Sequence, residues 1–249
     1  MKILVNPDIH GRTFWTNGIE RIGDFDKIIF LGDYLDPYHF ENIDVESAIA
    51  NFIDIMCFAK ENADKVVLLL GNHDIAYYSP AAHKTGLYGC RHLIAHHGQI
   101  SSLFSENTDL FKIAHYEGGI LFTHAGVTPL WLRVITNEPL STEQLCDRLN
   151  DFLTEDLGGG SPLHMVSAYR GGYDVSGSCI WTDVREMVSR DIKRFIGFRQ
   201  VFGHTLLAYD GADGEIHYGN PIESDNWKML DTACAYKLDT DSFKITQMK

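Results

Sequence analysis

The sequence predicts an α/β fold in which buried strands end at one common edge. Four short runs are continuously apolar rather than alternating, as is typical of strands covered on both faces; they are residues 3–5, 27–31, 66–70 and 120–122. Residues 44–60, between the second and third run, repeat apolar side chains at helical spacing. A strand–helix–strand order implies a right-handed crossover, so we expect the strands that it joins to pair in parallel.

The first helix is expected to follow Asp44, a residue type that favours the N-cap position. Its apolar positions fall on one face and are Val45, Ala48, Ile49, Phe52, Ile53 and Met56. This pattern is typical of a helix that covers a sheet, so we assign it no chemical role.

Two later helices are predicted from their first turns. Residues 141–144 read Ser-Thr-Glu-Gln, a capping box, and are followed by Leu145, Leu149 and Phe152. Asp183 and Glu186 have the same spacing before a helix with apolar positions Val184, Val188 and Ile192. Short strands are expected at 200–202, 228–230, 235–238 and 243–246, with a turn at 239–242.

Length and composition favour one globular domain over residues 1–249. The chain is 45% hydrophobic, 12% aromatic and 22% charged, which is ordinary for a folded protein. Its net charge of −13 argues against a dedicated nucleic-acid surface, which would normally be basic. The same charge is awkward for an enzyme that acts on phosphates, but two divalent cations would dominate the field in the cleft.

The sequence predicts a cytoplasmic protein. Its five cysteines are odd in number and widely spaced, without a C-x-x-C pair, which is typical of a reducing compartment. The apolar run at residues 3–5 is too short for a signal peptide. No stretch approaches the ~20 apolar residues that a membrane span needs.

Five clusters that contain histidine or aspartate are the main chemical feature of the chain, and four of them open directly after an apolar run. The clusters are Asp8-Ile9-His10-Gly11, Gly32-Asp33-Tyr34-Leu35-Asp36, Gly71-Asn72-His73-Asp74, Thr123-His124-Ala125-Gly126 and Gly203-His204-Thr205. In open α/β sheets, ligands bind beyond the carboxyl ends of the strands, because the loops converge there. One rim can therefore collect all five clusters.

The clusters supply the mixed oxygen and nitrogen ligands that divalent metals prefer, without any cysteine. Six candidate ligands are Asp8, His10, Asp33, Asn72, His124 and His204. Six ligands are too many for one tetrahedral zinc ion and suit two metals that share a carboxylate. Asp33 is the best candidate for the shared carboxylate. The sequence thus predicts a two-metal hydrolase.

In type and order, these clusters resemble the motifs D-x-H-G, G-D-x-x-D-R-G, G-N-H-[ED], H-A-G or H-G-G, and G-H-T of the calcineurin-like metallophosphoesterases. The resemblance is to the phosphoprotein-phosphatase branch, including bacterial serine/threonine phosphatases, and spans roughly residues 3–235. Residues 124–131, His-Ala-Gly-Val-Thr-Pro-Leu-Trp, are similar to bacterial symmetrical diadenosine tetraphosphatases. Residues 230–233, Leu-Asp-Thr-Ala, are similar to the Leu-Asp-Thr-Gly stretch that closes that branch.

The resemblance implies a four-layer β-sandwich flanked by helices, with a binuclear centre of Mn²⁺ and/or Fe, or alternatively Zn²⁺. The first metal would be held by Asp8, His10 and Asp33. The second metal would be held by Asp33, Asn72, His124 and His204. His73 is then the expected general acid for the leaving oxygen, oriented by Asp36, because an imidazolium beside a carboxylate can supply a proton near neutral pH.

The chain departs from the family at one functional position. The arginine that grips the phosphate in the family is replaced here by Pro37, which is followed by Tyr38. Arg170, Arg185 and Arg12 are the candidates to take its place, since a guanidinium suits phosphate oxygens. Arg170 is favoured because the glycines that follow it allow the backbone to approach a ligand.

The leading hypothesis is a metal-dependent phosphomonoesterase that acts on a phosphoprotein or a small phosphate ester by direct in-line attack of a metal-bound hydroxide. One alternative is a dinucleoside polyphosphate pyrophosphohydrolase, and another is a catalytically silent scaffold of the same fold. Residues 75–115 are rich in His and Tyr, among them His92 and Tyr88, and form a candidate substrate cap or a solvated helical insertion. The substrate, the metal pair and the oligomeric state stay open at this point.

Overall fold

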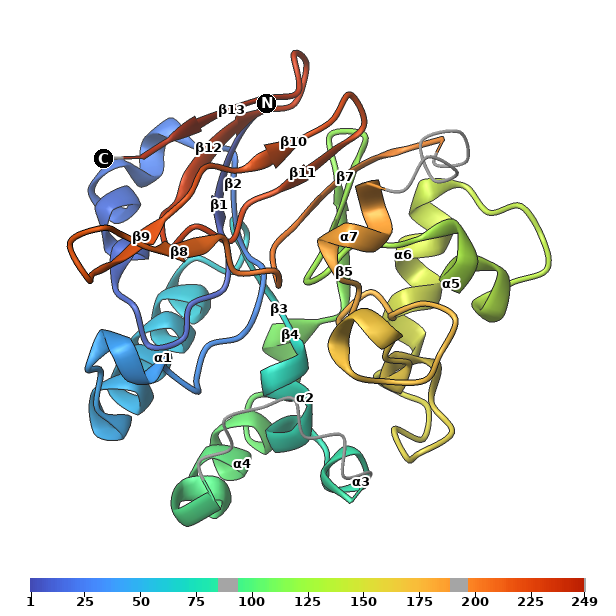
Figure 1. Cartoon of the computed structure of the whole chain (residues 1–249), viewed down its shortest axis with the longest axis horizontal. Helices are drawn as coiled ribbons and strands as arrows, with labels where there is room; N and C mark the ends of the chain where they lie inside the picture. The colour runs from blue at the N-terminus through green and yellow to red at the C-terminus, as the bar shows by residue number, and fades with distance from the viewer. Residues whose placement is uncertain (85–93, 189–196, 249) are drawn as a thin grey trace.

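Two β-sheets packed face to face form the centre of the protein (Figure 1). They are seen in a computed structural model that describes residues 1–84, 94–188 and 197–248. The first sheet has the strand order β13-β12-β1-β2-β3-β4. Its strands, in chain order, are β1 Lys2–Asn6, β2 Lys27–Phe30, β3 Val66–Leu69, β4 Phe111–Lys112, β12 Tyr236–Asp239 and β13 Lys244–Gln247.

The second sheet has the order β10-β11-β7-β6-β5. Its strands are β5 Ala114–Glu117, β6 Ile120–Thr123, β7 Arg199–Phe202, β10 Ile222–Glu223 and β11 Trp227–Met229. A separate hairpin pairs β8 Ala208–Asp210 with β9 Ile216–Tyr218. The predicted tail strands are confirmed, but the structure assigns β11 to the second sheet and its successors β12 and β13 to the first.

Helices cover the outer faces of both sheets. The α-helices are α1 Val45–Glu61, α2 Asn72–Tyr78, α3 Pro80–His83, α4 His97–Ser105, α5 Pro129–Ile135, α6 Thr142–Asp151 and α7 Val184–Val188. The 3-10 helices are η1 Phe14–Asp24, η2 His39–Glu41, η3 Ile94–His96, η4 Thr108–Leu110, η5 Pro162–His164 and η6 Ala168–Arg170. Figure 1 shows α1 and the α5–α6 pair on opposite sides of the sheets. The structure therefore confirms the α/β class, with layers in the order helix, sheet, sheet, helix.

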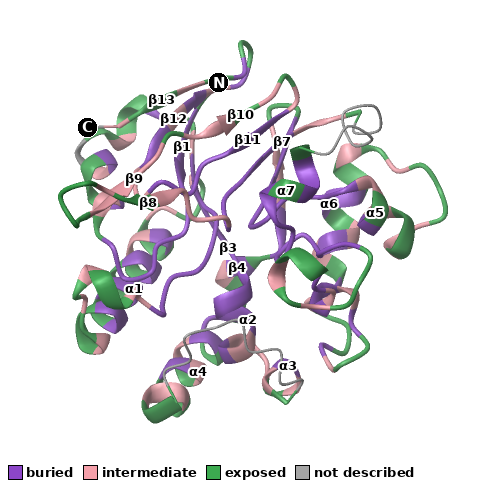
Figure 2. Ribbon diagram, viewed as in Figure 1, coloured by how far each residue is buried: buried purple, intermediate pink, exposed green. Residues whose placement is uncertain are grey.

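Alternation along the buried strands explains the four layers. In β1, Ile3 and Val5 belong to the core between the sheets, whereas Leu4 packs in the core that includes α1. In β6, Phe122 faces the space between the sheets and Leu121 lies in the core formed with α6. Strands with two covered faces need apolar side chains at every position, which is why the runs are continuous. Figure 2 shows these central strands as buried.

The predicted helix starts are confirmed at two positions. The Asp44 carboxylate accepts a hydrogen bond from the Ser47 amide at 2.7 Å. Ser141 and Gln144 form the reciprocal capping box of α6. The described part of α7 ends at Val188, so the predicted apolar position at Ile192 lies outside the described residues.

The parallel strands place the chemical clusters at one rim. β1, β2 and β3 run parallel, as do β6, β7 and β11. The two sheets are tied where these strands end, because the His204 amide donates to Asp8 at 2.9 Å, and Nδ1 of His124 bonds the Leu31 carbonyl at 2.9 Å. The predicted rim is thus present, with three strand ends from one sheet and two from the other.

The segment 75–115 contributes to both sheets as well as to the surface. Its described part contains α3, α4, β4 and the first half of β5, while residues 85–93, with Tyr88 and His92, lie outside the described residues. Phe104 of α4 is fully buried and packs on Phe52 and Phe111. In the described ranges, no helix has both the length and the apolar character needed to cross a lipid bilayer.

Candidate metal centre

All six predicted metal ligands meet at the rim and are buried. Their side chains are at most 7% exposed. Oδ2 of Asp33 is 3.4 Å from Nε2 of His10 and 3.4 Å from Nε2 of His124. Two clusters of candidate ligand atoms, each within 4.8 Å, therefore share Asp33: His10, Asp33 and His73 form one, and Asp33, His124 and His204 form the other.

Backbone carbonyls orient two of the imidazoles. Nδ1 of His10 lies 2.8 Å from the Leu35 carbonyl, and Nδ1 of His124 lies 2.9 Å from the Leu31 carbonyl. A carbonyl can only accept, so Nδ1 carries the hydrogen in both rings and the Nε2 lone pair faces the centre. Such fixation of the tautomer by the second ring nitrogen is typical of metal-binding histidines.

The atoms around His124 fit a cation. Its Nε2 is 3.0 Å from Oδ1 of Asn72 and 3.1 Å from Nδ1 of His204, besides the Asp33 oxygen. Nε2 of His204 is buried and has no hydrogen-bond partner among the described residues. Several lone pairs pointing at one another repel unless a positive charge lies between them, which is the environment a divalent metal provides.

The pKa shifts of the rim residues also favour a site for a cation. Burial, followed by the charges of Asp231 and Asp33, raises the pKa of Asp8 well above its usual range. Burial lowers the pKa of His124, and burial together with the Arg170 charge lowers that of His204. Neutral imidazoles are the form that binds metals, and crowded carboxylates are stabilised by cations.

The site holds its residues in strained backbone. Four of the seven non-glycine residues with positive φ in the described chain are site residues: His10 (46°), Asp33 (54°), Asp36 (60°) and His204 (70°). Such conformations cost roughly 1–3 kcal/mol each and persist only when their surroundings enforce them. Asp74 is one such restraint, because its carboxylate accepts from the amides of Asp33 (2.6 Å), Tyr34 (3.0 Å) and Gly71 (2.8 Å).

Two of the predicted glycines are required by close approach. A Cβ added at Gly71 would lie 2.1 Å from Oδ1 of Asp33, and one at Gly203 would lie 1.8 Å from Oδ2 of Asp8. The carboxylates of Asp33 and Asp8 thus lie against the backbone of these glycines, so a side chain at either glycine position would displace a predicted ligand.

His73 and Asp36 are in contact, as the sequence predicted. Nδ1 of His73 is 2.8 Å from Oδ2 of Asp36, which is fully buried. Tyr77 was not anticipated; its hydroxyl donates to the other Asp36 oxygen at 2.7 Å. The signal for Tyr77 was its position four residues after His73 in a helix, which puts both side chains on one face.

The three candidate arginines lie at different depths. Arg170 donates to the His204 carbonyl at 3.2 Å and forms an ion pair with Asp183 at 2.9 Å. Arg12 is buried, donates to the Asp8 carbonyl at 2.9 Å, and has a free Nη2 within the described structure. Arg185 reaches Asp183 from the outer side and is 57% exposed, so only Arg12 and Arg170 border the centre.

Asp231 is a further buried carboxylate at the rim. Both of its oxygens lack a hydrogen-bond partner in the portion of the chain that is described. Burial raises its pKa to about 7, with Arg12 opposing and Asp33 adding to the rise. In the sequence, Asp231 stands out only as part of the Leu-Asp-Thr-Ala stretch, for which the pattern predicts no chemical role.

Comparison with solved structures finds the same fold at low sequence identity. Two structures of a cold-active protein tyrosine phosphatase, one a point mutant, are 12% identical and give TM-scores of 0.55 and 0.57. They are matched over 100% of this chain and 80% and 78% of theirs. A metallophosphoesterase from Sphaerobacter thermophilus is 13% identical with a TM-score of 0.48, over 99% of this chain and 87% of that one.

Comparison with curated proteins gives no match. The family model for calcineurin-like phosphoesterases, by contrast, matches residues 1–207, which include all five clusters. This match covers most of the chain, and the rim geometry provides the His and Asp groups for divalent metals that the family uses. The protein therefore belongs to the calcineurin-like phosphoesterase family and is a phosphoester hydrolase.

Proposed function

We propose that the protein is a phosphomonoesterase with two divalent metal ions that share Asp33. The first ion is held by Asp8, His10 and Asp33. The second is held by Asp33, Asn72, His124 and His204. The observation that carries the proposal is the presence of Asp33 in both clusters of candidate ligand atoms. Ions held by these residues would supply charge neutralisation for the phosphate and an activated water nucleophile.

The residues around the ions have separate roles in this proposal. His73 donates a proton to the leaving oxygen, and Asp36 keeps Nδ1 of the imidazole protonated and the ring oriented. Tyr77 fixes the far side of Asp36. The scaffold alternative is disfavoured because all six ligand positions retain side chains able to bind metal.

Arg170 is the proposed replacement for the missing phosphate-gripping arginine. It is anchored to the carbonyl of a predicted ligand, and its side chain is 26% exposed, so part of the guanidinium reaches solvent at the rim. Arg12 supports the other side of the centre from a buried position. Arg185 is committed to Asp183 and the Tyr169 carbonyl, so we assign it no contact with the transferred phosphoryl group.

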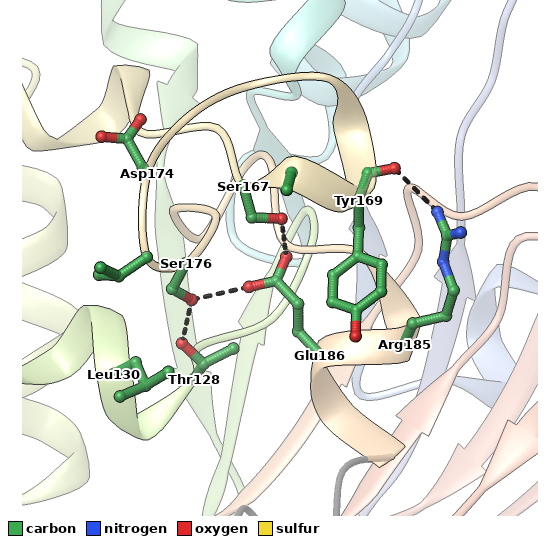
Figure 3. A pocket seen from close by; sticks show the side chains of 10 residues that line it. Thr128, Leu130, Ser167, Tyr169, Asp174, Ser176, Arg185 and Glu186 are labelled. Atoms are coloured by element: carbon green, nitrogen blue, oxygen red, sulfur yellow. Dashed lines mark hydrogen bonds between the residues drawn. The ribbon is translucent and has the colours of Figure 1, made fainter.

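One observation favours the second candidate, a dinucleoside polyphosphate pyrophosphohydrolase. A cavity of about 260 Å³ lies beside Arg185 and includes Thr128 and Leu130 from the tetraphosphatase-like stretch (Figure 3). Glu186 lines this cavity and accepts hydrogen bonds from Ser167 and Ser176, which line it as well. This cavity could take the second nucleoside of such a substrate, whereas a phosphomonoesterase does not need it.

The native metals and the compartment are proposed on chemical grounds. Oxygen and nitrogen ligands favour Mn²⁺ or Fe, with Zn²⁺ as the alternative. Cys57, Cys146, Cys179 and Cys234 are free, which supports a reducing compartment such as the cytoplasm.

Three substrates assayed side by side test the proposal: p-nitrophenyl phosphate, a phosphopeptide and diadenosine tetraphosphate. Metal-loaded protein should release inorganic phosphate from the two monoesters at rates well above that on the dinucleotide. Turnover of the dinucleotide far above both monoesters would replace the leading proposal by the second candidate. Elemental analysis of the same preparation should find about two metal ions per chain.

A further inference from the structure

Two aromatic side chains follow Pro37, the residue that stands where the family carries its phosphate-gripping arginine. Tyr38 and Phe40, which we call the aromatic shelf, follow Pro37 directly after the second cluster. Their rings are stacked, with centroids 5.2 Å apart and planes at 28°. The loop that lacks this arginine thus carries two stacked aromatic rings, one of which contacts the His10 ring.

The shelf is continuous with the reacting groups. The His73 and His10 rings meet edge to face at 5.0 Å, and the His10 and Tyr38 rings do so at 4.9 Å. His73 is the group that protonates the leaving oxygen in the proposed function. The organic part of a leaving group would therefore lie beside His73. The His10 ring connects His73 to Tyr38, because it contacts both.

Arg12 supports the shelf from one side, and the outer ring of the shelf, Phe40, is exposed. The Arg12 guanidinium lies 5.3 Å from the Tyr38 ring and 5.6 Å from the Tyr218 ring, and it is held by Glu41 at 2.6 Å. Phe40 is 43% exposed, and η2, which carries it, contains no buried residue. An exposed Phe alone means little, but this one stacks on a Tyr ring that Arg12 supports and that contacts the His10 ring.

We propose that the aromatic shelf binds the ring of an aryl leaving group, so that the enzyme prefers aryl phosphate monoesters over alkyl ones. The substrate class is a phosphorylated phenol, either a phosphotyrosine side chain or a small aryl phosphate. Water adds to phosphorus, the P–O(aryl) bond breaks, and the phenoxide oxygen takes the His73 proton, so the products are a phenol and inorganic phosphate. This inference rests on the proposed phosphomonoesterase function.

Phosphonates test ring binding without any contribution from leaving-group reactivity, because their P–C bond is not hydrolysed. The experiment compares inhibition constants of phenylphosphonate and ethylphosphonate on metal-loaded protein. Taking the ratio of the two cancels differences in metal content and in phosphate contacts. A stacked aromatic pair predicts a preference of roughly 3–10-fold for the phenyl compound.

Phe40→Ala should bring this ratio close to one, and Phe40→Leu should restore it only in part. Ile53→Ala is the control, because Ile53 is an exposed apolar residue of α1 that belongs neither to the shelf nor to the cavity of Figure 3. That variant should keep the wild-type ratio. A ratio that survives Phe40→Ala, or that collapses in Ile53→Ala, would overturn the shelf as the ring-binding site.

Paired substrates extend the test to turnover. With one peptide phosphorylated on either tyrosine or serine, Phe40→Ala should raise KM for the phosphotyrosine form and leave kcat largely unchanged. Phenyl phosphate in parallel distinguishes a protein source of the phenol from a small-molecule source. Equal wild-type KM values for both peptides, together with a phosphonate ratio of one, would refute the inference while the phosphomonoesterase function stands. Failure to cleave any monoester would instead refute both.

Discussion

Asp33 is the residue on which the proposed two-metal centre depends. Its backbone is left-handed, with φ of 54°, and its carboxylate meets an amide and two imidazoles. Oδ1 accepts from the His73 amide at 3.0 Å, while Oδ2 is equidistant from His10 and His124 at 3.4 Å. A strained backbone that aims one carboxylate at two ligand sets is consistent with a functional constraint rather than with packing.

Replacing Asp33 with Asn tests the bridge directly. Asn keeps the shape but removes the negative charge and one acceptor oxygen, so the protein should retain fewer than one metal ion per chain and lose phosphoesterase turnover. Inductively coupled plasma analysis and a p-nitrophenyl phosphate assay measure the two effects. Asp54→Asn, on the exposed face of α1, is the control and should behave as wild type. Normal metal content and activity in Asp33→Asn would exclude the bridging role.

Replacing His73 with Asn separates proton donation from metal binding. Metal content should stay at the wild-type level, while kcat should fall by ~10²–10⁴, as is typical when a general acid is removed. The loss should be larger for an alkyl phosphate than for p-nitrophenyl phosphate, whose leaving group is stable without a proton. Equal losses on the two substrates would argue that His73 acts by some other means.

At the scale of elements, helix α2 connects the site to the fold. Its first turn presents Asn72 and His73 to the rim, and Asp74 ties this turn to the loop after β2 through the amides of Asp33 and Tyr34, besides accepting from the N-cap amide of Gly71. The Asp74 carboxylate thus caps the start of α2 and also holds the loop after β2 in place. Short helices placed this way hold ligands more firmly than a loop alone would.

Asp74→Ala should therefore destabilise the protein strongly. Three buried amides would lose their acceptor at a cost of about 1–3 kcal/mol each, partly offset by relaxation and water entry. We expect the free energy of unfolding to fall by about 3–5 kcal/mol in urea denaturation, compared with less than about 0.5 kcal/mol for Asp54→Ala at the surface. A decrease under 1 kcal/mol would mean that the positive-φ conformation of Asp33 is enforced by other contacts.

Strand β5 provides a pH-dependent contribution to stability that is independent of the metals. Burial, with Lys112 and Lys27, lowers the pKa of His115 from 6.5 to about 4, although Glu117 lies 3.6 Å away. The unfolded chain therefore takes up this proton at higher pH than the folded protein. The free energy of unfolding should fall as pH drops from 6.5 to 4, by at most about 3 kcal/mol from this group.

His115→Gln should weaken that dependence. The difference between variant and wild type in denaturation experiments at pH 7 and pH 4.5 isolates the histidine from other titrating groups. The exposed His39→Gln serves as control and should follow the wild-type curve. An identical pH dependence in wild type and His115→Gln would show that His115 titrates alike in both states.

At the scale of the whole molecule, the sequence predicts which residues gather at the rim better than it predicts how the strands are divided between the two sheets. Strand ends and helix starts are local signals, so β1, β2, β3, β6 and the caps of α1 and α6 could be predicted from patterns. The division of the tail between two sheets depends on pairing across most of the chain, as in the register of Trp227 with Gln200. Short exposed strands such as β8 and β9 carry too little apolar pattern to be recognised.

In the candidate site, too, the residues with local sequence signals could be predicted, and those that depend on long-range contacts could not. Residues inside the five clusters were predicted, because each cluster is contiguous and follows an apolar run. Tyr77, Asp183 and Asp231 act on the site through contacts that only the fold creates. The glycines after Arg170 favoured that arginine from the sequence, but only the structure shows that Arg185 pairs with Asp183 from the outer side.

Anomalous diffraction from a crystal soaked in Mn²⁺ tests the shared-carboxylate centre most directly. Two anomalous peaks roughly 3.5–4 Å apart should appear at the rim, with the Asp33 carboxylate bound to both. Asp8 and His10 should complete one site, and Asn72, His124 and His204 the other. A single peak, or two peaks that do not both contact Asp33, would contradict the binuclear account.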